Sequence, residues 1–234
     1  MLVHVGDERN GTIDRHLAAA LSTIAGALNA VGFLIASSFT ANMTGNLSAF
    51  ADEVARGSWR SSLGFLFLLA LFIAGATLAA AFIVFGEQRG LRSVYAAAIA
   101  TEGVIVAALG PLLSFHDDGS KAWLVGCLSL VMGLQNAVTT LISRSRVRTT
   151  HVSGMATDIG IGLAAILTPG RSRTAALPNL GLHVLTLSAF ALGGIAGALL
   201  HAAIGPWLFT LAGGCLLAIA LPEMLRARHL PRPD

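Results

Sequence analysis

The chain has 234 residues, of which 55% are hydrophobic and 12% are charged, and its formal net charge is +3. Soluble domains carry roughly 25% charged residues, so this sequence lacks the polar side chains needed to cover a water-facing surface. The composition excludes an ordinary soluble domain, a disordered chain and a coiled coil. Cys127 and Cys215 both lie in apolar runs, which also excludes a disulfide-stapled secreted domain. Most of the surface must therefore face lipid.

Six apolar runs are long enough to cross a membrane, which takes about 20 residues for roughly 30 Å of hydrocarbon. The predicted spans are residues 16–36, 61–86, 93–113, 122–142, 180–204 and 206–225. A polar segment, 1–15, precedes them and lacks the pattern of a cleavable signal peptide. A polar loop, 114–121, follows Pro111 and separates the third and fourth spans, and residues 226–234 form a tail.

Two shorter segments, 42–56 and 151–168, decide the architecture. Both look helical but contain glycine and are interrupted by Asn, Thr, Ser and Asp. The first would be about 22 Å long at 1.5 Å per residue, which is too short to span comfortably. One interpretation is a pair of interfacial or somewhat polar spanning helices. The other is a pair of re-entrant or broken helices that line a cavity.

The chain also repeats itself, because three motifs return in the same order in its second half. GALNAV at Gly26 returns as GLQNAV at Gly133, and TANMTGN at Thr40 returns as TTHVSGM at Thr149. FIAGATLAA at Phe72 returns as ALGGIAGAL at Ala191. In the third match Gly75 is aligned with Gly194. The motifs predict two membrane repeats, 16–113 and 122–225. Each repeat then contains a span, a short polar helix and two more spans.

The basic residues indicate how the two halves are oriented, since Lys and Arg are retained on the cytoplasmic side. If neither short helix crosses, twelve arginines fall on one face and Arg56, Arg60 and Lys121 on the other. If both cross, the split falls to ten against five. The first arrangement is favoured and places both termini in the cytoplasm. Three spans in each repeat is an odd number, so the halves would be inverted.

At these motifs the chain resembles the YoaK-like family of bacterial multi-pass membrane proteins, a domain of unknown function. The residues that carry the resemblance are G-x-x-N-A-V at 26–31, M-T-G-N at 43–46, MGLQNAV at 132–138 and VRTTHVSG at 147–154. The resemblance covers essentially the whole chain and implies a bundle of transmembrane helices with no assigned activity. In the family pattern an acidic residue replaces Asn29 and a histidine replaces Asn42. The first departure argues against a proton-carrying role at position 29.

Broken helices at matching positions of two repeats are the best sequence indicator of a transporter site. Thr44 and Ser153 can cap a helix start, glycine lets the chain break, and a half-helix N-terminus favours an anion. The candidate solute-binding residues are Asn29, Asn42, Thr44, Gly45, Asn46, Asn136, His151, Ser153 and Gly154. In the alternative, these segments are tightly packed helix crossings, and Asn29 and Asn136 bond across the interface between the repeats.

Two carboxylates at membrane depth are candidates for proton or cation coupling. Glu102 lies near the centre of the third predicted span, where it is either such a site or a structural hydrogen-bond donor. Asp158 follows His151 by two helical turns, so both would reach a common cavity if the second short helix is re-entrant. In the alternative, His151 caps the helix at the interface and Asp158 meets an arginine. The arginines at 144, 146 and 148 indicate topology and contact with anionic headgroups, with attraction of the substrate as a secondary role.

The sequence thus predicts an all-α, polytopic membrane bundle of six spans and two short polar helices. The leading function is a small transporter or permease of the inner membrane that binds a small polar or anionic solute between the repeats, with proton coupling as an option. The alternatives are an uncoupled channel and an accessory protein whose glycine-rich helix faces bind a partner. A homodimer through those faces, which include Gly193 and Gly197, is also allowed. The sequence contains no enzyme, metal or cofactor motif and no basic patch for nucleic acid, so we expect none of these activities.

Overall fold

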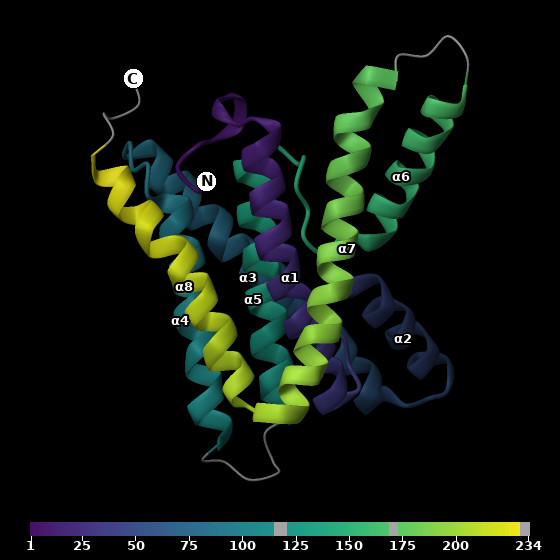
Figure 1. Ribbon diagram of the computed structural model, residues 1–234. Helices are drawn as coiled ribbons and strands as arrows, with labels where there is room; N and C mark the ends of the chain where they lie inside the picture. The colour runs from purple at the N-terminus through teal and green to yellow at the C-terminus, as the bar shows by residue number, and fades with distance from the viewer. Residues whose placement is uncertain (115–120, 169–172, 230–234) are drawn as a thin grey trace.

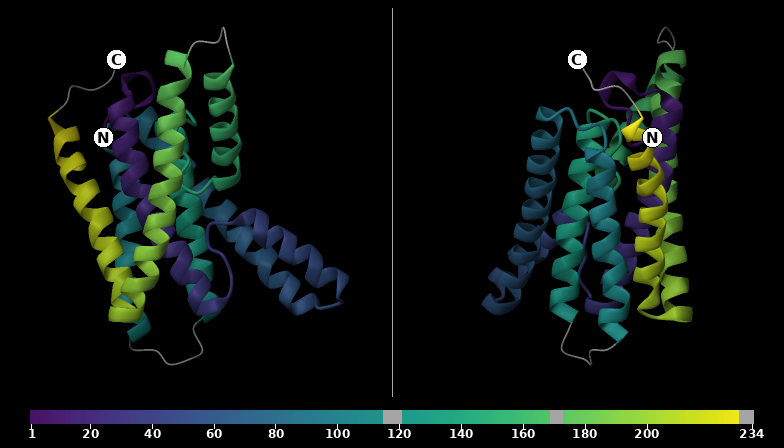
Figure 2. Two further views of the ribbon diagram at one scale, coloured as in Figure 1. Left: turned by 45° about the vertical axis from the view of Figure 1, so that its right-hand side comes forward. Right: turned by 90° about the vertical axis from the view of Figure 1, so that its left-hand side faces the viewer.

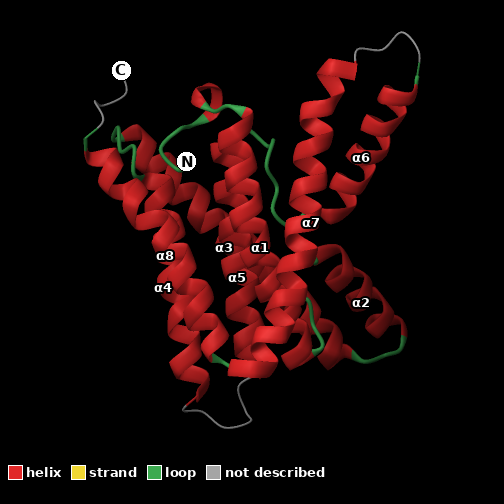
Figure 3. Ribbon diagram, in the orientation of Figure 1, coloured by secondary structure: helices red, strands yellow, loops and turns green. Residues whose placement is uncertain are grey.

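The computed structural model describes residues 1–114, 121–168 and 173–229, and their regular structure is helical throughout (Figures 1 and 3). In these residues six helices are long and apolar enough to cross a membrane: α1 (Gly11–Ala36), α3 (Trp59–Gln88), α4 (Val94–Ser114), α5 (Lys121–Ile142), α7 (Arg173–Ile204) and α8 (Trp207–Arg228). Two shorter helices, α2 (Met43–Ala55) and α6 (Val152–Leu167), and the 3-10 turn η1 (Gly6–Glu8) complete the described structure. The predicted all-helical membrane bundle is confirmed. Most of the loop predicted over 114–121 lies outside the described residues.

The predicted spans fall inside the observed helices, except that those of α4 and α8 start one residue too early, and the largest differences are at the starts of α1 and α7. α1 begins at Gly11 rather than at residue 16, because the side chain of Asn10 accepts a hydrogen bond from the backbone N–H of Ile13 (2.9 Å) and caps the helix. α7 begins at Arg173 rather than near residue 180. Hydropathy locates the apolar part of a helix, whereas the cap decides where its backbone begins.

α4 continues past Pro111, where the sequence suggested that it would end. Proline has no N–H, so the carbonyl oxygen of Ala107 loses its usual partner within the helix. The hydroxyl of Thr210 in α8 donates to that oxygen at 3.1 Å. A hydrogen bond from the neighbouring helix thus replaces the one that the proline removes.

The long helices pack in pairs: α1 with α7, α3 with α5, and α4 with α8. The short helices pack beside the helices that follow them, α2 on α3 and α6 on α7. Exchanging α1–α4 with α5–α8 converts the α1–α7 pair into the α5–α3 pair, and the α2–α3 pair into the α6–α7 pair. The packing therefore follows the predicted correspondence between the halves.

Glycines bring the first two helix pairs into backbone contact. A Cβ at Gly26 in α1 would overlap the carbonyl oxygen of Phe190 in α7. A Cβ at Gly133 in α5 would overlap the carbonyl oxygen of Phe72 in α3. Gly26 and Gly133 belong to the repeated GALNAV and GLQNAV motifs, so matching glycines make matching helix crossings.

The reciprocal contacts fix the register of the third motif. A Cβ at Gly193 would overlap the carbonyl oxygen of Thr23, and one at Gly75 would overlap that of Leu130. Gly75 therefore occupies the position in α3 that Gly193 occupies in α7. The sequence alignment of Gly75 with Gly194 was wrong by one residue, because a run rich in Gly and Ala does not define its own register.

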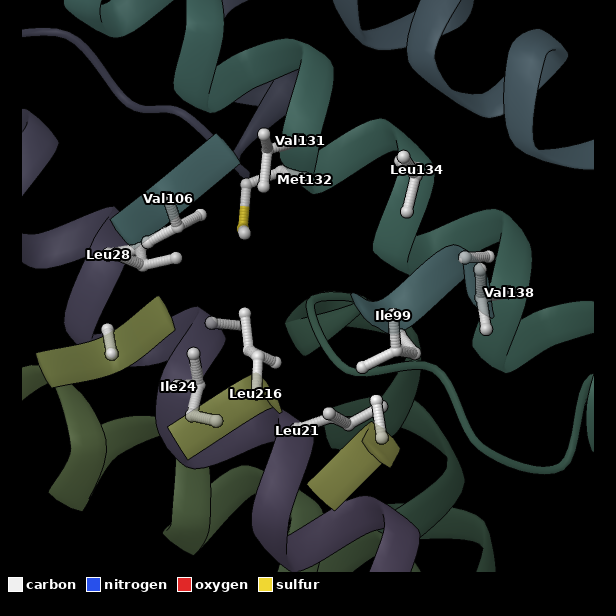
Figure 4. Packing of buried hydrophobic residues seen from close by; sticks show 14 of the residues in the cluster. Leu21, Ile24, Leu28, Ile99, Val106, Val131, Met132, Leu134, Val138 and Leu216 are labelled. Carbon is white, nitrogen blue, oxygen red and sulfur yellow. The ribbon is translucent and has the colours of Figure 1, made fainter. Parts of the chain in front are cut away.

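The core lies between α1, α4, α5 and α8, where Leu28, Val106, Met132 and Leu216 are fully buried against one another (Figure 4). The outer face of α3 carries exposed apolar side chains, including Phe67 and Phe82. In a membrane protein such a face contacts lipid, so its exposure in the isolated chain is expected.

α2 and α6 begin at the side of the bundle near its mid-height and run toward opposite ends of the molecule (Figures 1 and 2). α1 ends at Ala36, its C-cap Ser37 has a left-handed φ of 52°, and residues 38–42 return to the start of α2. α5 ends at Ile142, Arg144 beyond it has a left-handed φ of 50°, and the chain returns to the start of α6. This is the course expected of the predicted re-entrant helices.

Candidate functional site

The two short helices begin at one cavity of about 810 Å³, which both halves of the chain line. Seven of the predicted solute-binding residues line it: Asn29, Asn42, Thr44, Gly45, Asn136, His151 and Ser153. The sequence analysis did not include the remaining lining residues, which are Phe39, Ala41, Met43, Ser48, Phe72, Thr140, Arg148, Thr150, Val152 and Phe190. The cavity thus brings together most of the predicted site from two distant parts of the sequence.

Asn29 and Asn136 tie the returning segments to the helices that precede them. The Oδ1 atom of Asn29 accepts a hydrogen bond from the backbone N–H of Ala41 at 3.0 Å. The Oδ1 atom of Asn136 accepts one from the hydroxyl of Thr150 at 2.9 Å. Both bonds lie within one half of the chain, so the predicted bond across the interface between the repeats is not the one that forms. The asparagines shape the cavity wall by holding the chain where it turns back.

The start of α2 is capped by Asn42 and not by Thr44. The Oδ1 atom of Asn42 accepts a hydrogen bond from the backbone N–H of Gly45 at 3.0 Å. A Cβ at Gly45 would lie 2.7 Å from Nδ2 of Asn42, so the glycine makes room for its own cap. The sequence suggested Thr44 because Ser and Thr are common caps, but the helix begins two residues earlier than that assignment requires.

The start of α6 is built differently. His151 occupies the N-cap position without a side-chain cap bond, and Ser153 lies inside the helix, so the predicted cap at Ser153 is also wrong. The imidazole of His151 lies where a Cβ at Gly154 would be, which explains the glycine. The first backbone N–H groups of α6 thus receive no side-chain cap at the cavity.

Asn46 and Gly154 support the site from behind rather than lining the cavity. Asn46 is buried, and its Nδ2 atom donates to the carbonyl oxygen of Phe39 at 2.8 Å. This bond anchors the segment that returns to α2. Gly154 accommodates the ring of His151. Both residues therefore act through the chain segments that they position.

Arg148 is a functional candidate for which the sequence favoured topology over attraction of the substrate. Arg144 pairs with Asp7 at 2.6 Å and Arg146 with Asp14 at 3.2 Å. Arg148 lines the cavity, and among the described residues it has no ion-pair partner. A sequence signal existed: if α6 is re-entrant, the residues just before it must also return into the bundle.

Asp158 and His151 line a second pocket of about 380 Å³ beside the cavity, between α6, α7 and the end of the returning segment. The predicted juxtaposition of these two residues is therefore present. The Oδ2 atom of Asp158 lies 3.7 Å from Nε2 of His183 in α7. The side chain nearest its carboxylate is thus a histidine and not the arginine that the alternative interpretation expected.

Glu102 does not line the cavity. It is fully buried in α4, where its neighbour Gly103 packs against Gly213 and Leu217 of α8. Neither carboxyl oxygen of Glu102 has a hydrogen-bond partner among the described residues. The structure separates this coupling candidate from the polar residues that surround the short helices.

Sequence comparison places the chain in a family without giving it an activity. Residues 17–221 match the family described as a protein of unknown function, DUF1275. No curated protein and no solved structure matches the chain. The match covers all but the two ends of the chain, and it fits the resemblance of the repeated motifs to an uncharacterised family of membrane proteins. The chain belongs to this DUF1275 family of unknown function.

Proposed function

We propose that this protein is a small transporter or permease whose solute binds in the cavity between α2 and α6. The observation that carries the proposal is the meeting of two short helices, from corresponding positions of two halves, at one cavity. Transporters built from repeats place their substrate at such discontinuous helices near the middle of the membrane. The repeat itself, in inverted form, is part of the proposal and is supported by the matched glycine contacts.

The chemistry of the lining favours a small polar or anionic solute. The cavity is surrounded by polar groups: the amides of Asn42 and Asn136, the hydroxyls of Thr44 and Ser153, and the imidazole of His151. The helix starts add backbone N–H groups and the positive end of the helix dipole, both of which favour negative charge. The volume of about 810 Å³ is large enough for a metabolite-sized molecule.

The orientation proposed for the protein has both termini in the cytoplasm. In Figure 1 the N-terminal segment and the C-terminal end of α8 lie at the same end of the bundle. Among the described residues, the segments at that end contain Arg9, Arg15, Arg89, Arg92, Arg144, Arg146, Arg173, Arg226 and Arg228. The opposite end has Arg56, Arg60 and Lys121. This asymmetry supports the proposed orientation through the retention of arginine on the cytoplasmic side.

The accessory-protein alternative is less well supported, because the glycine-rich faces it requires are used within the chain. Gly193 and Gly197 of α7 pack on Thr23 and Ala27 of α1. Gly75 of α3 packs on Leu130 of α5. A partner could reach these faces only by separating the helix pairs of the bundle.

The test is flux through the purified protein in liposomes, followed by light scattering. The probes are urea and glycerol as uncharged solutes, and potassium formate and potassium nitrate with valinomycin as anions. We expect at least one probe to pass faster than through empty liposomes. Gly154→Leu should reduce that flux at least about tenfold, because a side chain there displaces His151 at the start of α6. Gly160→Leu is the control, since a Cβ at Gly160 meets nothing within 4 Å.

Flux of no probe through correctly folded protein, or equal flux through the Gly154→Leu and wild-type proteins, would contradict the proposal. An imposed pH gradient separates the two transport mechanisms. Flux that accumulates solute against its gradient indicates proton coupling, and its loss in Glu102→Gln would assign that role to Glu102. Flux that follows the solute gradient alone indicates a channel.

A further inference from the structure

The pockets on the two sides of the cavity occupy corresponding positions and have opposite chemistry. The first is the pocket already described between α6 and α7, here called the charged vestibule, which includes Arg146, Arg148, His151, Asp158, Asn179 and His183. The second, here called the apolar pocket, has a volume of about 610 Å³ and includes Ser38, Ser61, Gly64, Phe65, Leu68 and Trp123.

The correspondence follows from the register that the glycine contacts define. With Gly75 equivalent to Gly193, the first-half equivalents of Asn179 and His183 are Ser61 and Phe65. In the same register Leu68 is the equivalent of Thr186, another vestibule residue. The α7 wall of the vestibule and the α3 wall of the apolar pocket therefore correspond, and they are polar on α7 and mostly apolar on α3. The remaining walls differ, because α6 lines the vestibule whereas α5 lines the apolar pocket.

Only the charged vestibule shares lining residues with the central cavity among the residues described. Arg148 and His151 line both spaces. No residue that lines the apolar pocket also lines the cavity. In this conformation the vestibule therefore adjoins the cavity, and it lies toward the end of the bundle that holds the N-terminal segment and the end of α8.

Arg148 supplies the unbalanced charge at the junction of these two spaces. Arg146 is paired with Asp14, and Asp158 lies beside His183 in the vestibule. The described residues that line the cavity include no carboxylate, and Arg148 is their one arginine or lysine. A cation without a protein partner in a partly enclosed space attracts anions more strongly than one in open water.

We infer that anions enter the cavity from the side of the chain termini through the charged vestibule, with Arg148 as the residue that selects them. The inference rests on the proposed binding cavity, and it adds the sign of the solute's charge, the side of entry and the selecting residue.

The test uses cysteine reporters and two small thiol reagents of opposite charge, so it needs no identified substrate. Ser153→Cys, at the cavity, is introduced into a Cys127→Ala, Cys215→Ala protein in native membranes. Gly11→Cys, at the start of α1, marks the terminal side, where a Cβ meets nothing within 4 Å. The probes are the anionic methanethiosulfonate ethylsulfonate and the cationic methanethiosulfonate ethyltrimethylammonium, applied to either face of the membrane.

We expect Ser153→Cys to react from the same face as Gly11→Cys, and with a higher ratio of anionic to cationic reagent rates than Gly11→Cys. Arg148→Gln should lower that ratio about tenfold, because losing one nearby charge affects the two reagents in opposite directions. Arg148→Lys should largely preserve the ratio. Arg144→Gln is the matched control, since it removes an equal charge that is paired with Asp7 outside the cavity.

Reaction of Ser153→Cys from the opposite face alone would overturn the entry route. An unchanged ratio in Arg148→Gln would overturn the selecting role of Arg148. If Ser153→Cys fails to fold, Thr140→Cys reports on the same cavity from α5. The labelling rates do not depend on solute flux, so the two proposals can fail separately. If the cavity selects the anionic reagent but the protein transports none of the flux solutes, the proposed function is contradicted and this inference stands.

Discussion

Single polar side chains determine where each half of the chain turns back into the bundle. Asn29 accepts from the backbone of Ala41, and Asn136 accepts from Thr150. Lipid offers no replacement for such a bond, so the residue that provides it fixes the path of the backbone. The role of Asn29 requires only an acceptor oxygen, which the acidic residue of the family pattern would also provide.

Asn29→Asp should therefore preserve the fold, whereas Asn29→Leu should not. Leucine leaves the buried N–H of Ala41 without a partner, and we expect a loss of about 1–3 kcal/mol of stability. The measurement is the midpoint of thermal unfolding in detergent, followed by size-exclusion chromatography. Equal midpoints for the leucine and aspartate variants would show that the hydrogen bond to Ala41 does not hold the segment.

At the scale of helices, close packing through glycine joins the two halves. Gly26 and Gly193 join α1 to α7, and Gly75 and Gly133 join α3 to α5. Small residues let helix backbones approach in membranes, where dispersion and not hydrophobic burial drives association. The helix pairs are thus the units on which the cavity is built.

Gly75→Ala should separate α3 from α5 and reduce stability by about 1–3 kcal/mol, the usual penalty for overpacking. Gly64→Ala in the same helix is the control, because its Cβ meets nothing within 4 Å and alanine favours the helix. Thermal midpoints of the two variants in one detergent give the comparison. A Gly75→Ala protein as stable as Gly64→Ala would mean that the α3–α5 contact is not close.

A second prediction at this scale concerns the proline in α4. Thr210→Val removes the donor to the carbonyl oxygen of Ala107, which Pro111 cannot supply, and should destabilise the protein by about 1 kcal/mol. Thr77→Val is the matched control, because the hydroxyl of Thr77 donates within its own helix to Ile73. Unfolding midpoints in detergent test the difference, and equal effects of the two changes would argue against a special role for Thr210.

Hydropathy and the repeated motifs were sufficient to predict the six spans, the two short helices and seven residues of the cavity. They did not predict the starts of α1 and α7, and the start of α1 depends on the local cap Asn10. They placed Glu102 among the coupling candidates because membrane depth can be predicted from sequence, whereas the face of α4 that meets α8 cannot. Substrate attraction by Arg148 stayed secondary to topology because its place at the cavity requires the three-dimensional course of residues 146–151.

For the whole molecule, the account depends on the two halves being inverted, with three crossings each and half-helices that meet at the cavity. Inversion puts corresponding pockets at opposite ends, so different side chains there can make one end polar and the other apolar. If α2 and α6 crossed the membrane, the halves would be parallel and the cavity at their starts would have no common depth. The number of crossings is therefore the central claim.

The most direct test is labelling of single cysteines at Gly11, Ser58 and Ser93 in the Cys127→Ala, Cys215→Ala protein, with a membrane-impermeant reagent on intact cells. The account predicts labelling at Ser58 alone, and labelling at all three positions after permeabilisation. Gly11 is the first residue of α1, Ser58 lies between α2 and α3, and Ser93 lies between α3 and α4. If Gly11 and Ser58 share one side and Ser93 lies on the other, α2 crosses the membrane and the inverted architecture is contradicted.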